Sequence, residues 1–521
     1  HIMANACLGK PCFYFGRIFR ERLNVPTQTM NFCRKIFLLV LCSSLFGCAA
    51  IDPQHVLTRQ FGNSAPADGR PLSPEIKQEA YDFVWNRVNE AYVDPQFNGV
   101  DWTHMGQLHY PRIMSAPNDA LFWRNLDEMV AELGDAHTRV LSAKQYANDK
   151  ERQSLTLGLN LSQTNEGILV FGVAKDSAAD QAKIVAEDKI LEIDGVEAQH
   201  WWQQQLQKAR KNSTERAREK SVRRLLNGGD PERAVNQIKL TVAAADGSVR
   251  MLELARTILP RKESITSQIY GGNIGYIKLT AFDQKLNGQI ASHFEKLKDT
   301  QALIVDLRGN GGGSLGMALN MMNHVVSGKI PIGERKTRTG KPPKFMFGLI
   351  TAGSLKLELK GVNRPYLNPL IVLVDSDSAS ASEFFSGSLQ AIGRAQVFGS
   401  TSCGCLLGYM GYANVPGGGA LAYSEMDFVP IAGQRIEGNG VIPNRMLTVS
   451  RADLIAKRDV VLEAAINALR EASSISAKGD GQSRSDIKAS GAQVQTVGTL
   501  TEMYLNSYRM NQAYLFTAFS L

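Results

Sequence analysis

The sequence predicts a mixed α/β protein with a helical N-terminal domain, a mainly β domain and a core of alternating strands and helices. Three observations lead to this prediction. Apolar residues recur at helix spacing over residues 72–148, short apolar runs dominate residues 150–258, and strand-like and helix-like segments alternate over residues 259–470. The chain of 521 residues is long enough for roughly three domains of ordinary size.

Two amphipathic stretches indicate the helical domain, and their apolar members are Ile76, Ala80, Phe83, Val84 and Val88, then Leu121, Leu126, Met129, Val130 and Leu133. The β domain shows predicted strands at Leu155–Leu161, Gly167–Val173 and Ile238–Ala244. A long basic helical segment, Trp201–Leu226, interrupts these strands. Its run of charges favours a solvated helix face.

In the core, the predicted strands are Ile274–Leu279, Ala302–Leu307, Leu370–Val374 and Ala395–Phe398. The predicted helices between them are Leu286–Leu297, Leu315–Val326 and Glu383–Ile392. This alternation is typical of a mixed α/β core.

Residues 1–47 predict a leader that begins with a cloning remnant. After Met30, two basic residues and an apolar run over 36–46 are typical of a secretory signal, and the run is too short to span a bilayer stably. Cys48 directly follows Leu45-Phe46-Gly47, which resembles a bacterial lipobox and predicts lipidation of Cys48. An ordinary signal peptide is the alternative.

Residues 48–71, rich in Pro, Gly, Ala and Asn, predict a tether, and residues 471–521 predict a flexible C-terminal tail. The leader holds six Lys or Arg residues and one acid, so removing it lowers the net charge from +8 to about +3. This weak, scattered charge does not favour a nucleic-acid partner.

Ser380 is the most informative residue of the core. It lies in a turn of small residues, Asp377–Ser382, between the predicted strand Leu370–Val374 and the helix that follows. Such a turn can place a serine hydroxyl at a helix N-terminus, where the helix dipole and unpaired N–H groups stabilise developing negative charge. The alternative is a capping box in which Glu383 reaches back to Ser380, and the two roles are compatible.

A glycine-rich segment, Asp306–Gly313, follows another predicted buried strand. Glycines let backbone N–H groups approach a ligand closely, as in a phosphate-binding loop or an oxyanion hole. The Gly-Lys-Ser/Thr ending of a phosphate-binding P-loop is absent, so the oxyanion hole is favoured.

Two further polar groups come from distant segments: His137 in Leu133–Thr138, and Glu437 in Arg435–Pro443. A lone histidine is more often structural than catalytic, and the glutamate alone indicates only a solvated turn. Serine, histidine and carboxylate become a catalytic hypothesis only through their geometry.

These segments together resemble the carboxyl-terminal processing (tail-specific) protease family, which shares its catalytic core with tricorn protease. The matching stretches are Gly275-Tyr276-Ile277, Leu307–Gly313, Ser378–Glu383, Ile436–Val441 and the Gly134-Asp135-x-His137-Thr138 signature. The resemblance covers about residues 72–470 and rests on the joint order of these motifs. It implies an αβ-sandwich (crotonase-like) protease core over residues 259–470.

Residues 150–258 resemble a PDZ domain with a helical insertion. The ending Lys189–Gly195 is similar to the usual PDZ ending. The resemblance implies that Gly158, Leu159, Asn160 and Leu161 form the peptide-binding loop.

The Ser/Lys branch of the family has its general-base lysine twenty-five positions after the serine, where this chain has Cys405. A thiol with an ordinary pKa near 8.5 is a poor base at pH 7, so a Ser/Lys dyad is not expected. The tricorn-like branch uses a histidine base and a glutamate near fifty-eight positions after the serine, and Glu437 lies fifty-seven positions after Ser380.

That branch implies Ser380 as nucleophile, His137 as general base and acid, and Glu437 as the residue that orients the imidazole, through an intermediary if needed. The backbone N–H of Ala381 and of a glycine in Gly311–Gly312 would form the oxyanion hole. Imidazole has a near-neutral pKa that suits the base role.

Two departures from the family pattern concern other positions. Asn444 replaces a usual aspartate and is expected to be structural. The pair Cys403 and Cys405 could bind metal or oxidise, but no further cysteines accompany it, so two small residues of the active-site wall are favoured.

The resemblance therefore predicts a periplasm-facing lipoprotein serine endopeptidase of the bacterial cell envelope, without metal or other cofactor. Its partners would be protein or peptide substrates, captured by strand addition at the PDZ domain, with a free C-terminus as one mode of capture, and a membrane reached through the lipid anchor. The alternatives are a catalytically inactive binding protein on the same fold and a PDZ adaptor with a degenerate protease core.

Overall fold

The computed structural model describes residues 71–472, apart from 152, 229–236, 261, 343, 346–349 and 352. The expected leader (1–47), lipidation at Cys48, nearly all of the tether and nearly all of the tail lie outside the described residues. Every element below belongs to the compact unit that ends at Ala465. Among the described residues, no helix combines the length and the apolar character that a bilayer crossing needs.

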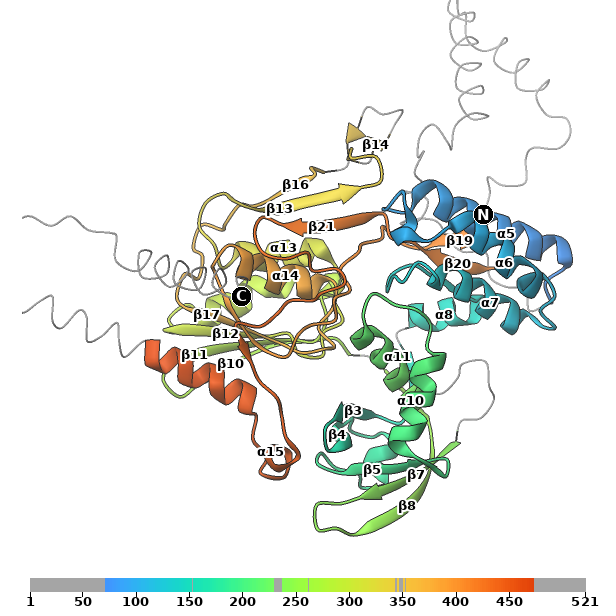
Figure 1. Cartoon of the computed structure of the whole chain (residues 1–521). Coiled ribbons are helices and arrows are strands. Elements are labelled where there is room, and N and C mark those ends of the chain that lie inside the picture. The colour runs from blue at the N-terminus through green and yellow to red at the C-terminus, as the bar shows by residue number, and fades with distance from the viewer. Residues whose placement is uncertain are drawn as a thin grey trace, which may run out of the picture. The chain divides into compact units, whose positions relative to one another are not determined.

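The expected helical domain contains α5 (Pro74–Ala91), η1 (Phe97–Gly99), α6 (Trp102–Met114), α7 (Asp119–Ala131) and α8 (Ala143–Glu151). Ser73, Asp101 and Asn118 cap α5, α6 and α7 through their side chains. A short strand that the sequence did not predict, β1 (Arg139–Leu141), pairs antiparallel with β20 (Gly419–Ala422), which in turn pairs with β19 (Ala413–Val415). These core strands share one hydrophobic cluster with α5, α6 and α7, so the segment around His137 is fixed to the core (Figure 1).

The β domain contains one sheet in the order β3 (Leu159–Thr164), β4 (Gly167–Val173), β5 (Lys189–Ile193), β7 (Gln237–Ala243) and β8 (Val249–Ala255). Smaller elements are β2 (Gln153–Thr156) paired with β9 (Thr257–Pro260), β6 (Val196–Glu197) on β5, and helix α9 (Ala178–Gln181). The strand predicted at Leu155–Leu161 is broken between β2 and β3 at Gly158, whose φ of +85° suits glycine.

The single helix predicted over Trp201–Leu226 is two helices, α10 (Ala198–Lys208) and α11 (Glu215–Gly228). Four residues of α11 are buried, and one of them is Arg223. The predicted solvated face is therefore wrong for part of α11, because that part packs against the core.

The core has a six-stranded sheet in the order β10 (Ile265–Tyr270), β11 (Ile274–Leu279), β12 (Ala302–Asp306), β17 (Leu370–Val374), β18 (Gln396–Gly399) and β22 (Arg445–Met446). β10 is antiparallel to β11, and the remaining pairs are parallel. A second sheet has the order β16 (Lys356–Leu359), β13 (Ile330–Thr337) and β21 (Met426–Pro430), beside the hairpin of β14 (Lys344–Phe345) and β15 (Ile350–Thr351). The strands predicted for this core are confirmed to within one or two residues.

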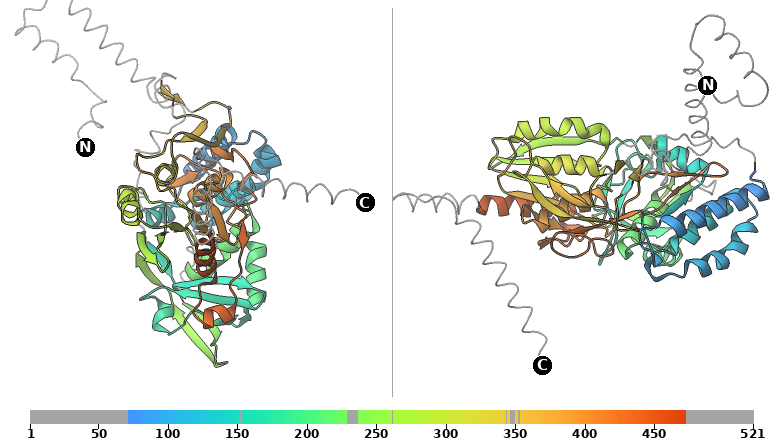
Figure 2. Two further views of the ribbon diagram at one scale, coloured as in Figure 1. Left: turned by 90° about the vertical axis from the view of Figure 1, so that its left-hand side faces the viewer. Right: turned by 90° about the horizontal axis from the view of Figure 1, so that it is seen from above.

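The core helices are η2 (Gln284–Gln289), α12 (Ile290–Leu297), α13 (Leu315–Asn323), α14 (Ala381–Ala391) and α15 (Arg451–Ile455). α14 packs on both core sheets, with α13 beside it, so these helices form a layer between the sheets (Figure 1). The yellow-green helices of residues 290–323 cover one side of the core strands (Figure 2).

Parallel pairing of β12 with β17 decides where the polar loops lie. The carboxyl ends of neighbouring parallel strands meet at one edge of a sheet, so the glycine loop after Asp306 and the serine turn after Val374 emerge side by side. The sequence separated these two segments by some seventy residues, and the sheet joins them.

Candidate active site

Ser380 stands immediately before α14 in a backbone conformation that non-glycine residues rarely adopt, with φ of 55° and ψ of −116°. Its N–H lies 3.0 Å from both the carbonyl oxygen of Cys405 and Oε2 of Glu383. A conformation of this kind costs on the order of 1–3 kcal/mol and persists only where surrounding contacts enforce it. Those contacts present the hydroxyl at the N-terminus of α14, as the sequence predicts.

Glu383 supplies most of these contacts from the first turn of α14. Its fully buried carboxylate also accepts hydrogen bonds from Gly404 N (2.6 Å), Cys405 N (2.9 Å) and Ser402 Oγ (2.5 Å). The predicted capping box between Ser380 and Glu383 is therefore confirmed, and the same carboxylate holds the loop that carries the cysteines. Burial raises the pKa of Glu383, and the hydrogen bonds oppose this effect.

The glycine loop touches the serine turn directly. The Asn310 carbonyl accepts from Ala379 N (3.0 Å) and Ser382 Oγ (2.9 Å). A Cβ atom on Gly312, whose φ is +98°, would come within 2.6 Å of the Ala379 oxygen and 2.7 Å of the Ser380 Cβ. Only glycine fits there without displacing the turn.

One of the expected oxyanion-hole donors is already engaged. Gly312 N–H donates to the Asn310 side chain at 2.9 Å, so Gly312 is not a free donor. Within the described chain, the N–H groups of Gly311 and Ala381 have no recorded acceptor. Ala381 directly follows Ser380, and Gly311 directly precedes Gly312, which packs on Ser380, so these two donors are available near the serine for a developing oxyanion.

Asp135 organises the turn that carries His137. Its buried carboxylate accepts from His137 N (2.7 Å), from Ser424 Oγ (2.6 Å) and from the Thr138 hydroxyl. The imidazole lies beside the Tyr409 ring, with centroids 5.9 Å apart, and its Nδ1 is buried without a partner among the described residues. The structure thus gives the Asp-x-His-Thr motif a physical reason, since Asp135 fixes the backbone of the histidine.

The environment of His137 favours the neutral imidazole. Burial lowers the pKa of His137 to about 4, and the cations Arg139 and Lys220 act in the same direction while Asp135 opposes them. At neutral pH the ring is therefore unprotonated and able to accept a proton.

Glu437 is joined to the histidine segment through Ser213. The carboxylate accepts from Leu406 N (2.5 Å) and Leu407 N (3.0 Å) and is hydrogen-bonded to the Ser213 side chain. Ser213 Oγ also accepts from Ala136 N at 3.0 Å. Burial, reinforced by Asp135, raises the pKa of Glu437 to about 7. Ser213 is thus an intermediary between Glu437 and the residue that precedes His137.

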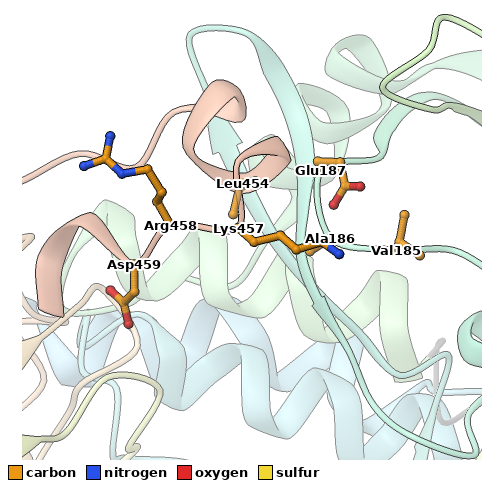
Figure 3. A pocket seen from close by; sticks show the side chains of 7 residues that line it. All are labelled: Val185, Ala186, Glu187, Leu454, Lys457, Arg458 and Asp459. Carbon is orange, nitrogen blue, oxygen red and sulfur yellow. The ribbon is translucent and has the colours of Figure 1, made fainter. Parts of the chain in front are cut away.

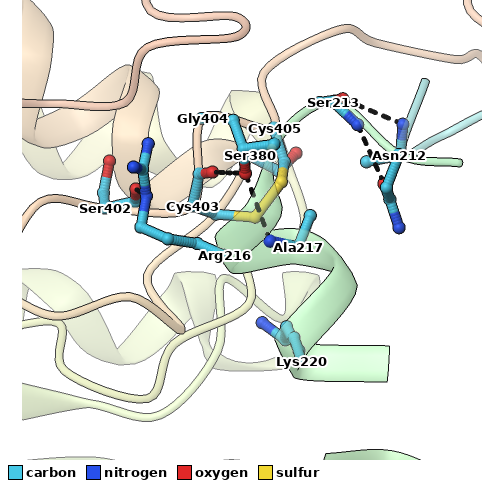
Figure 4. The surroundings of a disulfide bond; sticks show 12 residues. Asn212, Ser213, Arg216, Ala217, Lys220, Ser380, Ser402, Cys403, Gly404 and Cys405 are labelled. Atoms are coloured by element: carbon cyan, nitrogen blue, oxygen red, sulfur yellow. Dashed lines mark hydrogen bonds between the residues drawn. A yellow bond between two sulfur atoms is a disulfide. The ribbon is translucent and has the colours of Figure 1, made fainter. Parts of the chain in front are cut away.

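Cys403 and Cys405 form a disulfide inside this site, which differs from the expectation of two separate small residues. Both cysteines are buried in a cluster with Ala217 of α11 and Ala379, and Ala136 packs against that cluster (Figure 4). Ala379 precedes Ser380 and Ala136 precedes His137. The disulfide therefore lies where the serine, histidine and α11 segments meet.

Sequence reasoning missed the contribution of the segment that leads into α11. Thr214 donates to the Cys403 carbonyl, and Arg216 donates to the carbonyls of Ser402 and Asn439, both at 2.7 Å. Further along the helix, Lys220 and Arg223 bind Asp377, three residues before Ser380. A basic run facing its own acidic partners looks the same in sequence as a solvated one, so no local signal could have found these contacts.

The predicted peptide-binding loop lines a groove of about 500 Å³, together with residues of β2, β4 and β9. Gly158, Leu159 and Asn160 line this groove, whereas Leu161 is buried in the core of the β domain. Leu159 and Leu161 lie on the same face of β3 and both pack in that core, and of the two only Leu159 also lines the groove.

The backbone donors of that loop are already used within the chain. Leu157 N donates to the Asn227 carbonyl (3.0 Å), Gly158 N to Thr156 Oγ1 (2.9 Å) and Leu159 N to Asn227 Oδ1 (2.9 Å). The Asn227 amide also donates to the Leu159 carbonyl at 2.8 Å. The side chain of Asn227, near the end of α11, thus makes the pair of bonds that an added strand would make.

A second cavity, of about 420 Å³, lies between the β domain and the segment around α15 (Figure 3). Its lining residues are Val185, Ala186, Glu187, Leu454, Lys457, Arg458 and Asp459. None of these is among the predicted site residues.

The close approach at Gly312 generates the first prediction. Gly312→Ala is expected to lower the free energy of unfolding by about 2–4 kcal/mol, because the new Cβ is overpacked and the φ is positive. It should also slow reaction of Ser380 with a fluorophosphonate more than about tenfold. Urea unfolding and labelling kinetics measure the two effects. Gly316→Ala, whose Cβ would meet nothing nearer than Ser314 Oγ at 3.6 Å, is the control. Equal behaviour of the two variants would contradict the geometry described for the loop.

The lowered pKa of His137 generates a second prediction. Unfolded histidine binds a proton below about pH 6.5, whereas folded His137 does so only below about pH 4. The unfolded state binds more protons between these values, so this residue's contribution to stability is present above pH 6.5 and is lost as pH falls towards 4. Relative to His137→Asn, the wild type should lose about 2 kcal/mol of unfolding free energy between pH 7 and 4.5. A difference between the two proteins that stays constant across this range in urea unfolding would show that the ring is not buried in its neutral form.

Comparison with known families agrees with this arrangement. Residues 273–446 match peptidase family S41, residues 148–219 match the PDZ domain and residues 73–131 match the Tricorn protease C1 domain.

Relatives and solved structures extend the comparison. The chain is 26% identical over 338 residues to carboxyl-terminal-processing peptidase 3, chloroplastic, of Arabidopsis thaliana, covering 62% of this chain and 59% of that protein. It is 25% identical over 402 residues to a carboxyl-terminal-processing protease of Picosynechococcus sp., covering 74% and 88%. The solved structure of mature CPAF complexed with lactacystin shares the fold, with a TM-score of 0.55 at 15% identity over 76% of this chain and 98% of that one. The chain therefore resembles, in this order along the sequence, the Tricorn protease C1 domain, the PDZ domain and peptidase family S41, and it is similar to carboxyl-terminal-processing proteases.

Proposed function

We propose that this protein is a serine endopeptidase that cleaves peptide bonds through an acyl-enzyme on Ser380. The observation that carries the proposal is the enforced conformation of Ser380 at the N-terminus of α14, beside the open N–H groups of Gly311 and Ala381. A neutral, half-buried His137 follows Ala136, which packs against the same cluster of segments, and supplies a base.

In the proposed reaction, Ser380 Oγ attacks the scissile carbonyl carbon while its proton passes to the His137 imidazole. The carbonyl oxygen becomes an oxyanion held by Gly311 and Ala381 N–H. Collapse of this intermediate breaks the C–N bond, and the imidazolium returns the proton to the departing amine. Water then attacks the acyl ester with His137 again as base, which releases the carboxylic acid and restores the serine.

No hydrogen bond joins the Ser380 hydroxyl to the His137 ring within the described residues, and the ring instead contacts Tyr409. Catalytic hydrogen bonds often tighten only when substrate binds. The proposal therefore includes a shift of the His137 side chain towards Ser380 on substrate binding, with Glu437 and Ser213 holding the histidine backbone segment in place.

Protein or peptide substrates are supported by the PDZ domain, whose outermost strand β3 can add a further strand. We further propose that the protein works in the bacterial cell envelope, facing the periplasm as a lipoprotein anchored through Cys48, with envelope proteins as substrates. The signal-like leader supports this location, and so does the Cys403–Cys405 disulfide, since disulfides persist in oxidising compartments.

The test is reaction of the purified protein with a fluorophosphonate, with the modified peptide mapped by mass spectrometry. The label should appear on Ser380 and vanish in Ser380→Ala. His137→Ala should slow labelling at least about a hundredfold, since it removes the base, and Glu437→Gln about tenfold, since it acts only through Ser213.

His293→Ala is a matched control, because His293 is also buried but lies in α12, bonded to Ser267. Its labelling rate should stay within about twofold of the wild type. A folded wild type that takes no label would overturn the peptidase proposal and favour a catalytically inactive peptide-binding protein.

Occupation of the PDZ loop by Asn227 generates a further prediction. A peptide carboxylate must displace this side chain, so Asn227→Ala should raise the affinity for a fluorescent peptide with a free C-terminus by about tenfold. Fluorescence anisotropy measures the affinity, with the C-terminally amidated peptide as the ligand control and Gln203→Ala, exposed on α10, as the protein control. Unchanged or weaker binding in Asn227→Ala would mean that peptides do not enter at this loop.

A further inference from the structure

Lys220 is a lysine of α11 whose ammonium group is directed at the serine turn. Its Nζ donates to the Asp377 carbonyl at 2.9 Å and lies 3.6 Å from Asp377 Oδ1. The side chain is only 17% exposed. Burying an ammonium is costly unless it is well paired, so the fold holds this charge at the site at some expense.

The same ammonium also reaches the glycine loop. A Cβ atom on Gly311 would lie 3.8 Å from Lys220 Nζ, and nothing else lies within 4 Å of that position. Gly311 N–H is one of the two open donors beside Ser380. Lys220 is therefore a cation adjacent to the place where the oxyanion would form (its position on α11 appears in Figure 4).

Burial lowers the pKa of Lys220, and the carboxylates Asp377 and Asp375 oppose this effect and favour the ammonium form. Asp377 is shared with Arg223, whose guanidinium donates to Oδ1 at 2.7 Å, so one carboxylate faces two cations. Arg224 is a further nearby cation. The other nearby carboxylate, Asp375, has its pKa raised by burial and by Asp377, and it accepts from Gly309 N and Asp377 N. Asp377 therefore cannot neutralise Lys220 fully.

We propose that Lys220 is an electrostatic residue of the reaction, whose ammonium stabilises the oxyanion that forms on Ser380 attack beside Gly311. This inference rests on the proposed acylation of Ser380. A unit charge close to an oxyanion in a partly buried site is a large interaction, because the effective dielectric constant there is well below that of water. The lysine thus adds fixed positive charge to a hole that otherwise contains only two backbone N–H groups.

The same charge acts on the base. The charged groups that face His137 are Asp135, Arg139 and Lys220, and Lys220 contributes to lowering the pKa of His137. Removing the ammonium should therefore raise the pKa of His137. The acid limb of the pH–rate profile, where the labelling rate falls as His137 becomes protonated, should then move to higher pH. A residue that only anchors the turn would not shift this limb.

The experiment compares fluorophosphonate labelling of Ser380 in the wild type and four variants. Lys220→Met removes the charge, and Lys220→Gln removes it but keeps a hydrogen-bond donor for the Asp377 carbonyl. Lys220→Arg keeps the charge. Arg223→Met is the matched control, because it removes the other cation on Asp377 one turn along the same helix, away from Gly311.

Lys220→Met and Lys220→Gln should each lower the maximal labelling rate constant at least about tenfold with little change in the half-saturating concentration. Their acid limbs should lie at higher pH than that of the wild type. Lys220→Arg should stay within about threefold of the wild type with an unshifted limb. Arg223→Met, which removes an anchor of the same turn, should leave the acid limb unshifted and should lower the rate less than Lys220→Met does.

Equal losses in Lys220→Met and Arg223→Met, without a shifted acid limb, would overturn the inference and make Lys220 a structural anchor of the turn. Full activity of Lys220→Gln with an unshifted limb would overturn it as well, and this variant decides the matter if Lys220→Met does not fold. A folded wild type that is not labelled at Ser380 overturns the proposed function itself, and this inference with it.

Discussion

The buried carboxylate of Glu383 is the interaction on which the rest of the site depends. A carboxylate without solvent must be satisfied by hydrogen bonds, and this one draws in Ser380 N, Gly404 N, Cys405 N and Ser402 Oγ. These four donors bring the serine turn and the cysteine loop together at the start of α14. The disulfide then packs on α11, and the Gly312 approach closes the opposite side. The unusual backbone of Ser380 is a consequence of this arrangement rather than a local preference.

Helix α11 lies within residues 150–258, the segment expected to form the PDZ-like domain, yet its contacts serve two places. Arg216 and Lys220 hold loops around Ser380, whereas Asn227 fills the loop where a peptide would add. A change that displaces Asn227 therefore acts on the same rigid element that carries Lys220. Helices transmit such displacements because their backbone hydrogen bonds keep them stiff along their length. The peptide-binding loop and the serine turn are thus linked by one helix, and not only by the chain connection between domains.

Much of the fold could be predicted because it depends on local apolar patterns. Leu370–Val374 is a continuous apolar run and Ile274–Leu279 is mostly apolar, and the structure has both strands with the predicted bounds. Ser380 and Asp306–Gly313 could be found because small residues directly after a buried strand indicate a turn that can expose a hydroxyl or backbone N–H groups. Features that depend on partners distant in sequence could not be predicted. These are the pairing of β1 with β20, the inward-facing charges of α11, and the disulfide. The hydrogen bond from Gly312 N to the Asn310 side chain could not be predicted either, because it depends on how the glycine loop folds.

The central claim is that Ser380 attacks and that Gly311 and Ala381 receive the resulting oxyanion. The most direct measurement is a crystal structure of the protein with a peptide boronic acid, which forms a tetrahedral adduct on an activated serine. The account predicts a bond from boron to Ser380 Oγ, with one boronate oxygen within about 3.2 Å of Gly311 N and Ala381 N and another beside the His137 ring. A boronate bound elsewhere, or an adduct whose oxygens face neither donor, would contradict it.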